Sequence, residues 1–282
     1  MFLSEDNNEK PKGGHRLRLE PLFSKPLVFA TIPFLDGNPL LPRDLVSGII
    51  PTLDNSTAFE SGVEASSKYL KIGSTANMLL YGRTAFNDLT SATGLTIIAR
   101  FRSFTGARNI SLLGDQDPAT GNGIRLLYDD VATVTNGLIV NTDNSNSTRS
   151  AFDILGASSE DRFHTIALRH KVAATVGEFF VSGLPTTGET VGMTVSAQAG
   201  RATRIFGNRS GGSTDLAIQF LYAFEGELTD AEIFEISAKP YSSILEPIPT
   251  YQTVPAGAPV GGGFQAAWAA RANNLIGGGL YR

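Results

Sequence analysis

The stretch from Asp215 to Tyr241 constrains the fold of this chain most, because it joins a strand that is apolar on both faces to the start of a short helix. Alternation assigns the side chains of this strand to two faces, Leu216, Ile218, Phe220 and Tyr222 to one and Ala217, Gln219, Leu221 and Ala223 to the other. A strand whose two faces are both largely apolar is covered on both sides. We therefore expect this strand to lie inside a layered β-structure.

The residues after this strand predict one helix, over Asp230–Ala238. Thr229 and Glu232 have the spacing of a capping box, in which each residue satisfies a backbone N–H at the helix start. Pro240 ends the helix after about two and a half turns. A helix this short is not stable alone in water, so it must dock on a sheet. We expect it to close one end of a sandwich.

The remainder of the chain predicts an all-β fold. Thirty glycines and fourteen prolines indicate many turns. Further strands are expected over 25–34, 68–72, 95–104, 110–113, 123–128, 138–141, 163–170, 178–184 and 201–207, with one helical turn within 75–80. Strand 95–104 alternates clearly, with Thr96, Ile98, Arg100 and Arg102 on one face.

Both ends of the chain differ in composition from the part between them. Residues 1–21 are polar and predict an N-terminal arm, and residues 22–244 predict the sandwich. Residues 245–282 predict a C-terminal arm, first stiffened by four prolines and then interrupted by glycine triplets. Its apolar residues have no sheet of their own, so we expect them to bind a partner. These partner-binding candidates are Phe264, Trp268, Arg271, Leu275, Ile276, Leu280 and Tyr281.

Composition argues against several classes of partner. A formal net charge of −4 without a basic block argues against nucleic acid. No apolar run reaches the roughly 18 residues of a membrane span, so no membrane insertion is expected. The absence of cysteine excludes thiolate chemistry.

The polar residues predict no catalytic residue, metal or cofactor. His15, His164 and His170 are too scattered for a triad or a metal site. Asp115 and Asp117 offer oxygen ligands that calcium accepts, but turn formation explains them as well. Glu225 and Glu227 flank the Gly226 turn, and we expect them to stay solvated rather than to form a glycosidase pair.

Several motifs in the second half of the chain resemble the laminin-G-like branch of the concanavalin A-like jelly rolls. They are Phe163-His164, Phe180-Val181-Ser182-Gly183, Phe206-Gly207, Leu228 to Ile233 and Lys239-Pro240-Tyr241. The openings at 26–30 and 44–46 and the end at 266–280 resemble bacteriophage versions of this domain. The resemblance covers residues 22–244 and implies an all-β concanavalin A-like jelly-roll sandwich with extended N- and C-terminal arms.

The resemblance and the arms together lead to two hypotheses for function. The first is a non-enzymatic structural protein of a phage virion, which decorates or stabilises the particle through its arms. Its partners would be other capsid or tail proteins and further copies of itself. The alternative is a carbohydrate-binding module of a tail fibre or receptor-binding protein that holds host glycans. Tyr81 and Tyr128 are the nearest candidates for exposed loop aromatics. A glycoside hydrolase is a third reading, but the E-x-D-x-E strand of such relatives is missing.

Overall fold

The computed structural model describes residues 15–18, 23–35, 39–54, 59–64, 67–72, 78–103, 110–115, 123–131, 134–142, 150–152, 163–198, 200–206 and 216–247. The chain divides into two compact units, Met1–Pro247 and Ile248–Arg282, of which the second lies outside the described residues. No helix in the described ranges has the length and apolar character that crossing a membrane requires.

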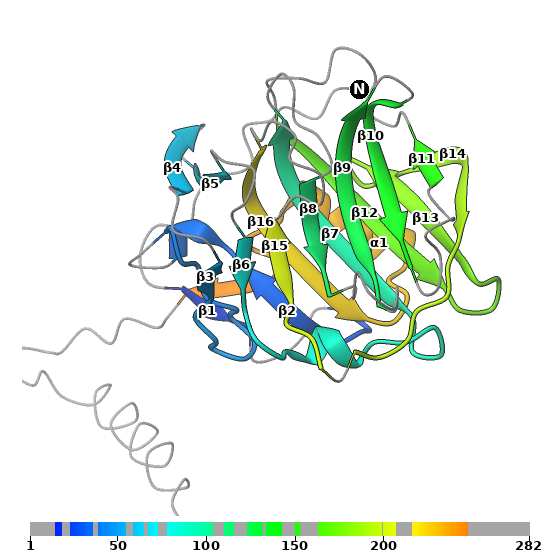
Figure 1. Cartoon of the computed structure of the whole chain (residues 1–282), viewed down its shortest axis with the longest axis horizontal. Helices are drawn as coiled ribbons and strands as arrows, with labels where there is room; N and C mark the ends of the chain where they lie inside the picture. The colour runs from blue at the N-terminus through cyan, green and yellow to red at the C-terminus, as the bar shows by residue number, and fades with distance from the viewer. Residues whose placement is uncertain are drawn as a thin grey trace, which may run out of the picture. The chain divides into compact units, whose positions relative to one another are not determined.

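Two antiparallel sheets form a sandwich (Figure 1). The seven-stranded sheet has the order β11 (Ser150–Phe152), β10 (Val134–Asn141), β9 (Arg125–Val131), β8 (Ile110–Gly114), β15 (Arg204–Phe206), β6 (Met78–Leu80) and β3 (Thr52–Asp54). The eight-stranded sheet has the order β14 (Leu184–Gly192), β13 (Val176–Val181), β12 (Phe163–Lys171), β7 (Leu95–Ser103), β16 (Leu216–Glu225), β5 (Ser67–Ile72) and β4 (Phe59–Glu64). Its eighth strand, β2 (Leu27–Thr31), also pairs with β16.

The main core lies between the two sheets. Strands of both sheets supply it, among them β7 through its alternate residues Leu95, Ile97, Ala99 and Phe101. Short 3-10 helices precede β7 and follow β2, over Ala85–Asp88 and Pro33–Leu35. The prediction of an all-β sandwich is confirmed.

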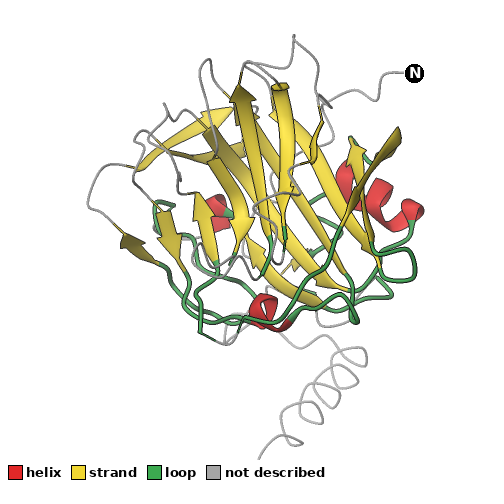
Figure 2. Cartoon of the chain, turned by 45° about the vertical axis from the view of Figure 1, so that its right-hand side comes forward, coloured by secondary structure: helices red, strands yellow, loops and turns green. Residues whose placement is uncertain are grey.

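A second apolar cluster covers the outer face of the eight-stranded sheet. Helix α1 (Asp230–Ala238) contributes Ile233 and Ile236, which pack with Phe220 and Tyr222 of β16. Figure 2 shows α1 against the outside of the strands. The predicted bounds of the helix and its capping box are confirmed. Its expected place was wrong, because its two buried isoleucines dock on a sheet face rather than close one end of the sandwich.

Strand β16 lies between β7 and the pair β5 and β2, and nine of its ten residues are buried. This confirms that the strand is covered on both faces. The predicted assignment of side chains to faces is wrong for half of the strand, because the register with β7 shifts between Ile218 and Phe220. After this bulge Phe220 and Tyr222 belong to the outer cluster, whereas Leu216 and Ile218 belong to the main core.

Strand β1 (His15–Leu17), inside the predicted N-terminal arm, pairs antiparallel with β17 (Leu245–Pro247). Leu17 packs against the outer cluster, in which Ile244 and Leu245 are buried. Arg16 adds an ion pair with Glu246 at 2.8 Å. The first and last described strands of the chain therefore hold each other in a separate two-stranded sheet.

Strands β3, β4 and β11 were not predicted, and two further elements differ from the prediction. Residues 78–80 form strand β6 rather than part of a helical turn, because Leu79 alternates into the main core. Ser182 and Gly183 both have positive φ values, of 52° and 80°, and connect β13 to β14 as a two-residue hairpin turn. Leu184 thus begins a strand of its own instead of ending the one before it.

Candidate functional site

The residues predicted to bind a partner all lie outside the described part of the chain. They are Phe264, Trp268, Arg271, Leu275, Ile276, Leu280 and Tyr281, and their role stays a prediction.

The two tyrosines named as loop aromatics are core residues, so that prediction was wrong. The Tyr81 ring packs edge-on against Phe29, and its hydroxyl donates to the Pro42 carbonyl at 2.7 Å. Tyr128 points inward from β9 and packs on Phe101, with ring centroids 5.4 Å apart. Both side chains are essentially fully buried and cannot touch a glycan.

The structure offers a different candidate on the outer face of the eight-stranded sheet. The outward side chains of β7 change along the strand from buried and uncharged to half-buried and positively charged. Thr96 and Ile98 are buried, the latter in the outer apolar cluster, whereas Arg100 and Arg102 are half-buried. We call the region around these arginines the Arg100 face, formed by Tyr69, Lys71, Arg100, Arg102, Phe163, Thr165 and Gln219.

Neutral groups of neighbouring strands hold the Arg100 guanidinium. Its Nε donates to Gln219 Oε1 at 2.7 Å, and its Nη1 donates to Thr165 Oγ1 at 3.2 Å. Gln219 and Thr165 are each only 3% exposed, so they form a buried polar floor. The bulge in β16 places Gln219 here, beside the outward Phe220, because it adds one residue to that side of the strand.

Two aromatic rings border this floor. The Phe163 and Tyr69 ring centroids are 5.6 Å apart, and Arg100 Cζ lies 5.9 Å from the Phe163 centroid. The Tyr69 ring lies against Gly62 of the paired strand, where an added Cβ would come within 2.1 Å of its Cζ. Gly62 therefore keeps the space that the tyrosine ring needs.

A second row of side chains extends the Arg100 face. Ala217 of β16 pairs with Lys71 on one side and Arg102 on the other, and Arg102 pairs with Phe163. Lys71, Arg102 and Tyr69 are all half-buried. The face thus combines hydrogen-bond donors and acceptors with two rings on a rigid sheet.

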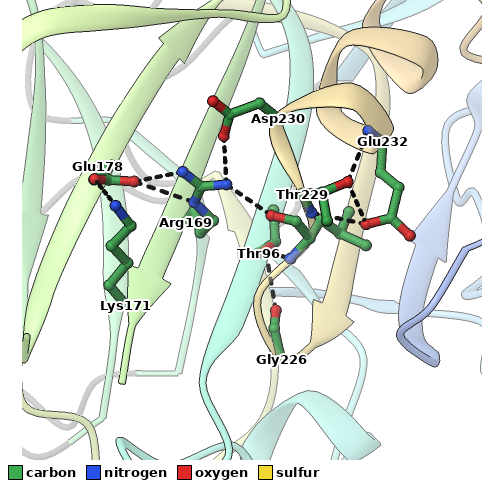
Figure 3. A network of polar contacts seen from close by, with 9 residues as sticks. Thr96, Arg169, Lys171, Glu178, Gly226, Thr229, Asp230 and Glu232 are labelled. Atoms are coloured by element: carbon green, nitrogen blue, oxygen red, sulfur yellow. Dashed lines mark hydrogen bonds and ion pairs between the residues drawn. The ribbon is translucent and has the colours of Figure 1, made fainter. Parts of the chain in front are cut away.

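The other end of the same sheet face carries an ion network that fixes α1 (Figure 3). Arg169 donates to Glu178 Oε2 at 2.6 Å, to the Leu228 carbonyl at 2.8 Å and to Asp230 Oδ1 at 2.7 Å. Burial acts to lower the pKa of Arg169, but the two carboxylates outweigh it and the pKa is raised. Burial likewise acts to raise the pKa of Glu178, yet Lys171 and Arg169 hold it below its usual range.

The remaining polar candidates have structural roles. Asp115 accepts the N–H of Ile124 at 3.0 Å and the side-chain amide of Asn87 at 3.1 Å, which shows it to be a buried turn residue. Asp117 lies outside the described residues. Glu227 accepts the N–H of Val172 at 2.7 Å, so it is not simply solvated as expected. No group of three or more potential metal ligands gathers among the residues that the structure describes.

The sequence contained a partial indication of the Arg100 face. Alternation placed Arg100 and Arg102 on one side of their strand, beside Thr96 and Ile98. On this side of the strand, the change from apolar residues to two arginines marks the point where the sheet is no longer covered by apolar side chains. The partners of Arg100 were not foreseeable, because Gln219 lies 119 residues away along the chain.

Comparison with known proteins shows which solved structures have a similar fold. No protein-family model matches this sequence, and no curated protein sequence matches it either. Among solved structures, the binding domain of Paraclostridial Mosquitocidal Protein 1 matches at TM-score 0.56 and 12% identity, over 75% of this chain and 51% of that one. Domain 4 of AbnA, an extracellular arabinanase from Geobacillus stearothermophilus in complex with arabinotriose, matches at TM-score 0.53 and 10% identity. The alignment covers 76% of this chain and 98% of that domain.

A sialidase from Trypanosoma rangeli matches at TM-score 0.52 and 16% identity, over 76% of this chain. The match spans only 33% of the sialidase, so it concerns one part of a larger enzyme. At these identities the likeness establishes the fold alone. The chain is an all-β sandwich of the kind that these solved structures share.

Proposed function

We propose that this chain is a non-catalytic carbohydrate-binding module and that the Arg100 face is its glycan site. The observation that carries the proposal is the set of rings and polar groups on one rigid sheet face. Sugar hydroxyls accept hydrogen bonds, and the half-buried Lys71, Arg100 and Arg102 carry donors on this face, with Gln219 and Thr165 holding Arg100 in place. The apolar face of a sugar ring packs on an aromatic ring, and the half-buried Tyr69, which packs on the buried Phe163, supplies such a ring.

The likeness to arabinanase domain 4 supports the same proposal, because that domain was solved with arabinotriose. Its fold therefore accommodates an oligosaccharide in at least one protein. The low identity of 10% carries no ligand over, so the sugar bound by this chain has to be found by experiment.

The non-catalytic part of the proposal is supported by the roles of three described carboxylates. A glycosidase needs two carboxyl groups that converge on one bond. Glu178 is held by Arg169 and Lys171, and Glu232 accepts the N–H groups of Ser24 and Thr229. Asp44 accepts the N–H groups of Ala30 and Val46. Each of these carboxylates supports the fold.

We further propose that the module is carried on a phage virion, through the predicted C-terminal arm. The resemblance to phage domains and the apolar residues in the sequence of the predicted arm support this. A chain truncated after Pro247 keeps β17 and should stay as stable as the full chain but fail to join particles or its own oligomer. Normal assembly of the truncated chain would remove the virion proposal without touching the glycan site.

The glycan site is tested by binding of the full chain to a panel of neutral and acidic oligosaccharides, with arabinotriose as the first probe. Affinities follow from isothermal titration calorimetry. Tyr69→Ala and Arg100→Ala should each weaken binding about tenfold or more, the loss of one stacking contact or one charge-assisted hydrogen bond. Gly62→Val should have a similar effect by displacing the Tyr69 ring.

Arg83→Ala is the matched control, because Arg83 is an exposed arginine whose described ion pair is with Asp88. It should bind like the unaltered chain. Binding that survives all three substitutions would place the site elsewhere, and failure of every oligosaccharide to bind would refute the proposed function.

A further inference from the structure

The segment Met193–Gln198 crosses the end of the sandwich as a strap between β14 and β15. It has no regular secondary structure, and only Met193, Val195 and Gln198 are buried. Met193 and Val195 belong to the main core, together with Leu95 at the start of β7. The strap therefore closes this end of the core with two apolar side chains.

Few bonds hold the strap. The Met193 N–H donates to the Thr175 carbonyl at 2.8 Å, and the Gln198 N–H donates to the Asn87 carbonyl at 2.7 Å. Between them, the Val195 N–H donates to Ser91 Oγ at 2.6 Å, and the Val195 carbonyl accepts the Ser91 N–H at 2.7 Å. A segment with so few anchors opens at a lower free energy than the paired strands beside it.

His170 lies beneath the strap. It occupies the inward side of β12, in register with Leu95 and Gly177, and its side chain is fully buried. Neither ring nitrogen has a hydrogen-bond partner among the described residues. The Met193 backbone raises the pKa of the ring, although it forms no hydrogen bond with either ring nitrogen. An imidazole in such surroundings stays neutral.

The charged groups around His170 would do little to stabilise a positive charge on its ring. Arg169 and Lys171, its neighbours along β12, project to the opposite face, where they bind Glu178. The carboxylate that acts on it is that of Glu227, which already accepts the Val172 N–H. The strap itself and the turn at 90–94 contain no charged residue. Burial lowers the pKa of His170, against the smaller opposing effects of the Met193 backbone and Glu227.

We propose that Met193–Gln198 is an acid-released strap and that protonation of His170 releases it. A proton on the ring places a cation against the Met193 side of the core, where the described surroundings cannot solvate it. When the strap lifts, water reaches the ring, and four hydrogen bonds donated by backbone N–H groups are lost. The release exposes the apolar end of the sandwich at Leu95 and Val195. This switch is independent of glycan binding.

The sign of the effect follows from proton linkage. With the strap open, His170 has an ordinary pKa near 6.5, whereas with the strap closed its pKa is lower. The open form therefore binds more protons below about pH 6.5, and the opening equilibrium rises by up to about tenfold per pH unit. The rise ends at the pKa of the closed form.

Amide hydrogen exchange of the full chain, followed residue by residue by NMR from pH 8 to pH 5, tests the proposal. After correction for intrinsic exchange rates, protection at Met193, Val195 and Gln198 should fall at acid pH. Protection at Ile98 and Leu221, in the paired strands β7 and β16, should not fall with it. His170→Leu and His170→Gln should each abolish the pH dependence of the strap amides.

His164→Gln is the control, because His164 lies on the same face of β12 but is only half-buried. It should retain the acid response. Strap amides that stay protected down to pH 5, a response that persists in both His170 variants, or simultaneous loss at Ile98 and Leu221 would each overturn the proposal. The last outcome would indicate acid unfolding of the whole sandwich.

Discussion

Replacing Arg169 by alanine should cost the sandwich about 3–4 kcal/mol of its free energy of unfolding. The Leu228 carbonyl is buried and would lose this donor, which costs about 1–3 kcal/mol. Contact of the guanidinium with the Phe180 ring, 4.8 Å away, contributes about 1 kcal/mol. The Asp230 side chain is 62% exposed, so its pair with Arg169 adds less than about 1 kcal/mol.

Urea unfolding monitored by far-UV circular dichroism measures this loss, and a thermal midpoint lower by about 10 °C should accompany it. Arg169→Lys should lose about half as much, because it keeps the charge but not the forked geometry. Asp230→Ala is the matched control and should cost under about 1 kcal/mol. The reasoning fails if Arg169→Ala costs less than about 1 kcal/mol or if Asp230→Ala costs as much.

Three further changes test the region around α1. Thr229→Ala should cost about 1 kcal/mol by the same urea assay, since it removes the cap that accepts the Glu232 N–H, and an unchanged midpoint would contradict this. Burial acts to raise the pKa of Glu232, but the N–H groups of Ser24 and Thr229 hold it below its usual range. The stabilisation that Glu232 contributes is present above about pH 4.5 and is lost as the pH falls through its folded-state pKa. Glu232→Gln should therefore flatten the acid side of the curve of melting temperature against pH. Curves of the two proteins that superimpose at acid pH would exclude this role. Gly183→Ala should cost at least about 2 kcal/mol, because φ is +80° and the new Cβ would lie 2.7 Å from Phe234 Cα, whereas Gly192→Ala meets no atom within 4 Å and should cost far less.

Local sequence signals predicted the elements they encode. The Thr229 and Glu232 pair fixed both the start and the capping of α1, because a capping box is formed within one helical turn. The apolar content of 216–225 predicted a strand covered on both faces, because burial is read directly from side-chain type.

What the sequence did not predict depends on contacts between distant residues. The bulge near Gln219 breaks strict alternation, and nothing in the strand's own composition marks it. Tyr81 was assigned to a loop, yet Phe29 and the Pro42 carbonyl enclose it, contributed by segments about 40 to 50 residues away. The Arg100 face likewise needs the register of β5, β16, β7 and β12 before its members meet.

The pairing of β1 with β17 has a mechanical consequence. His15 lies opposite Pro247, so a force that draws the two ends of the sandwich apart acts on one end of this short ladder. Its bonds would then break one after another, as in a zipper, rather than together. The Arg16–Glu246 ion pair and the bond from the Arg18 N–H to the Ile244 carbonyl would follow in turn. Under tension the β1–β17 pair should separate at low force, and the chain should lengthen before the force acts on β7 and β16.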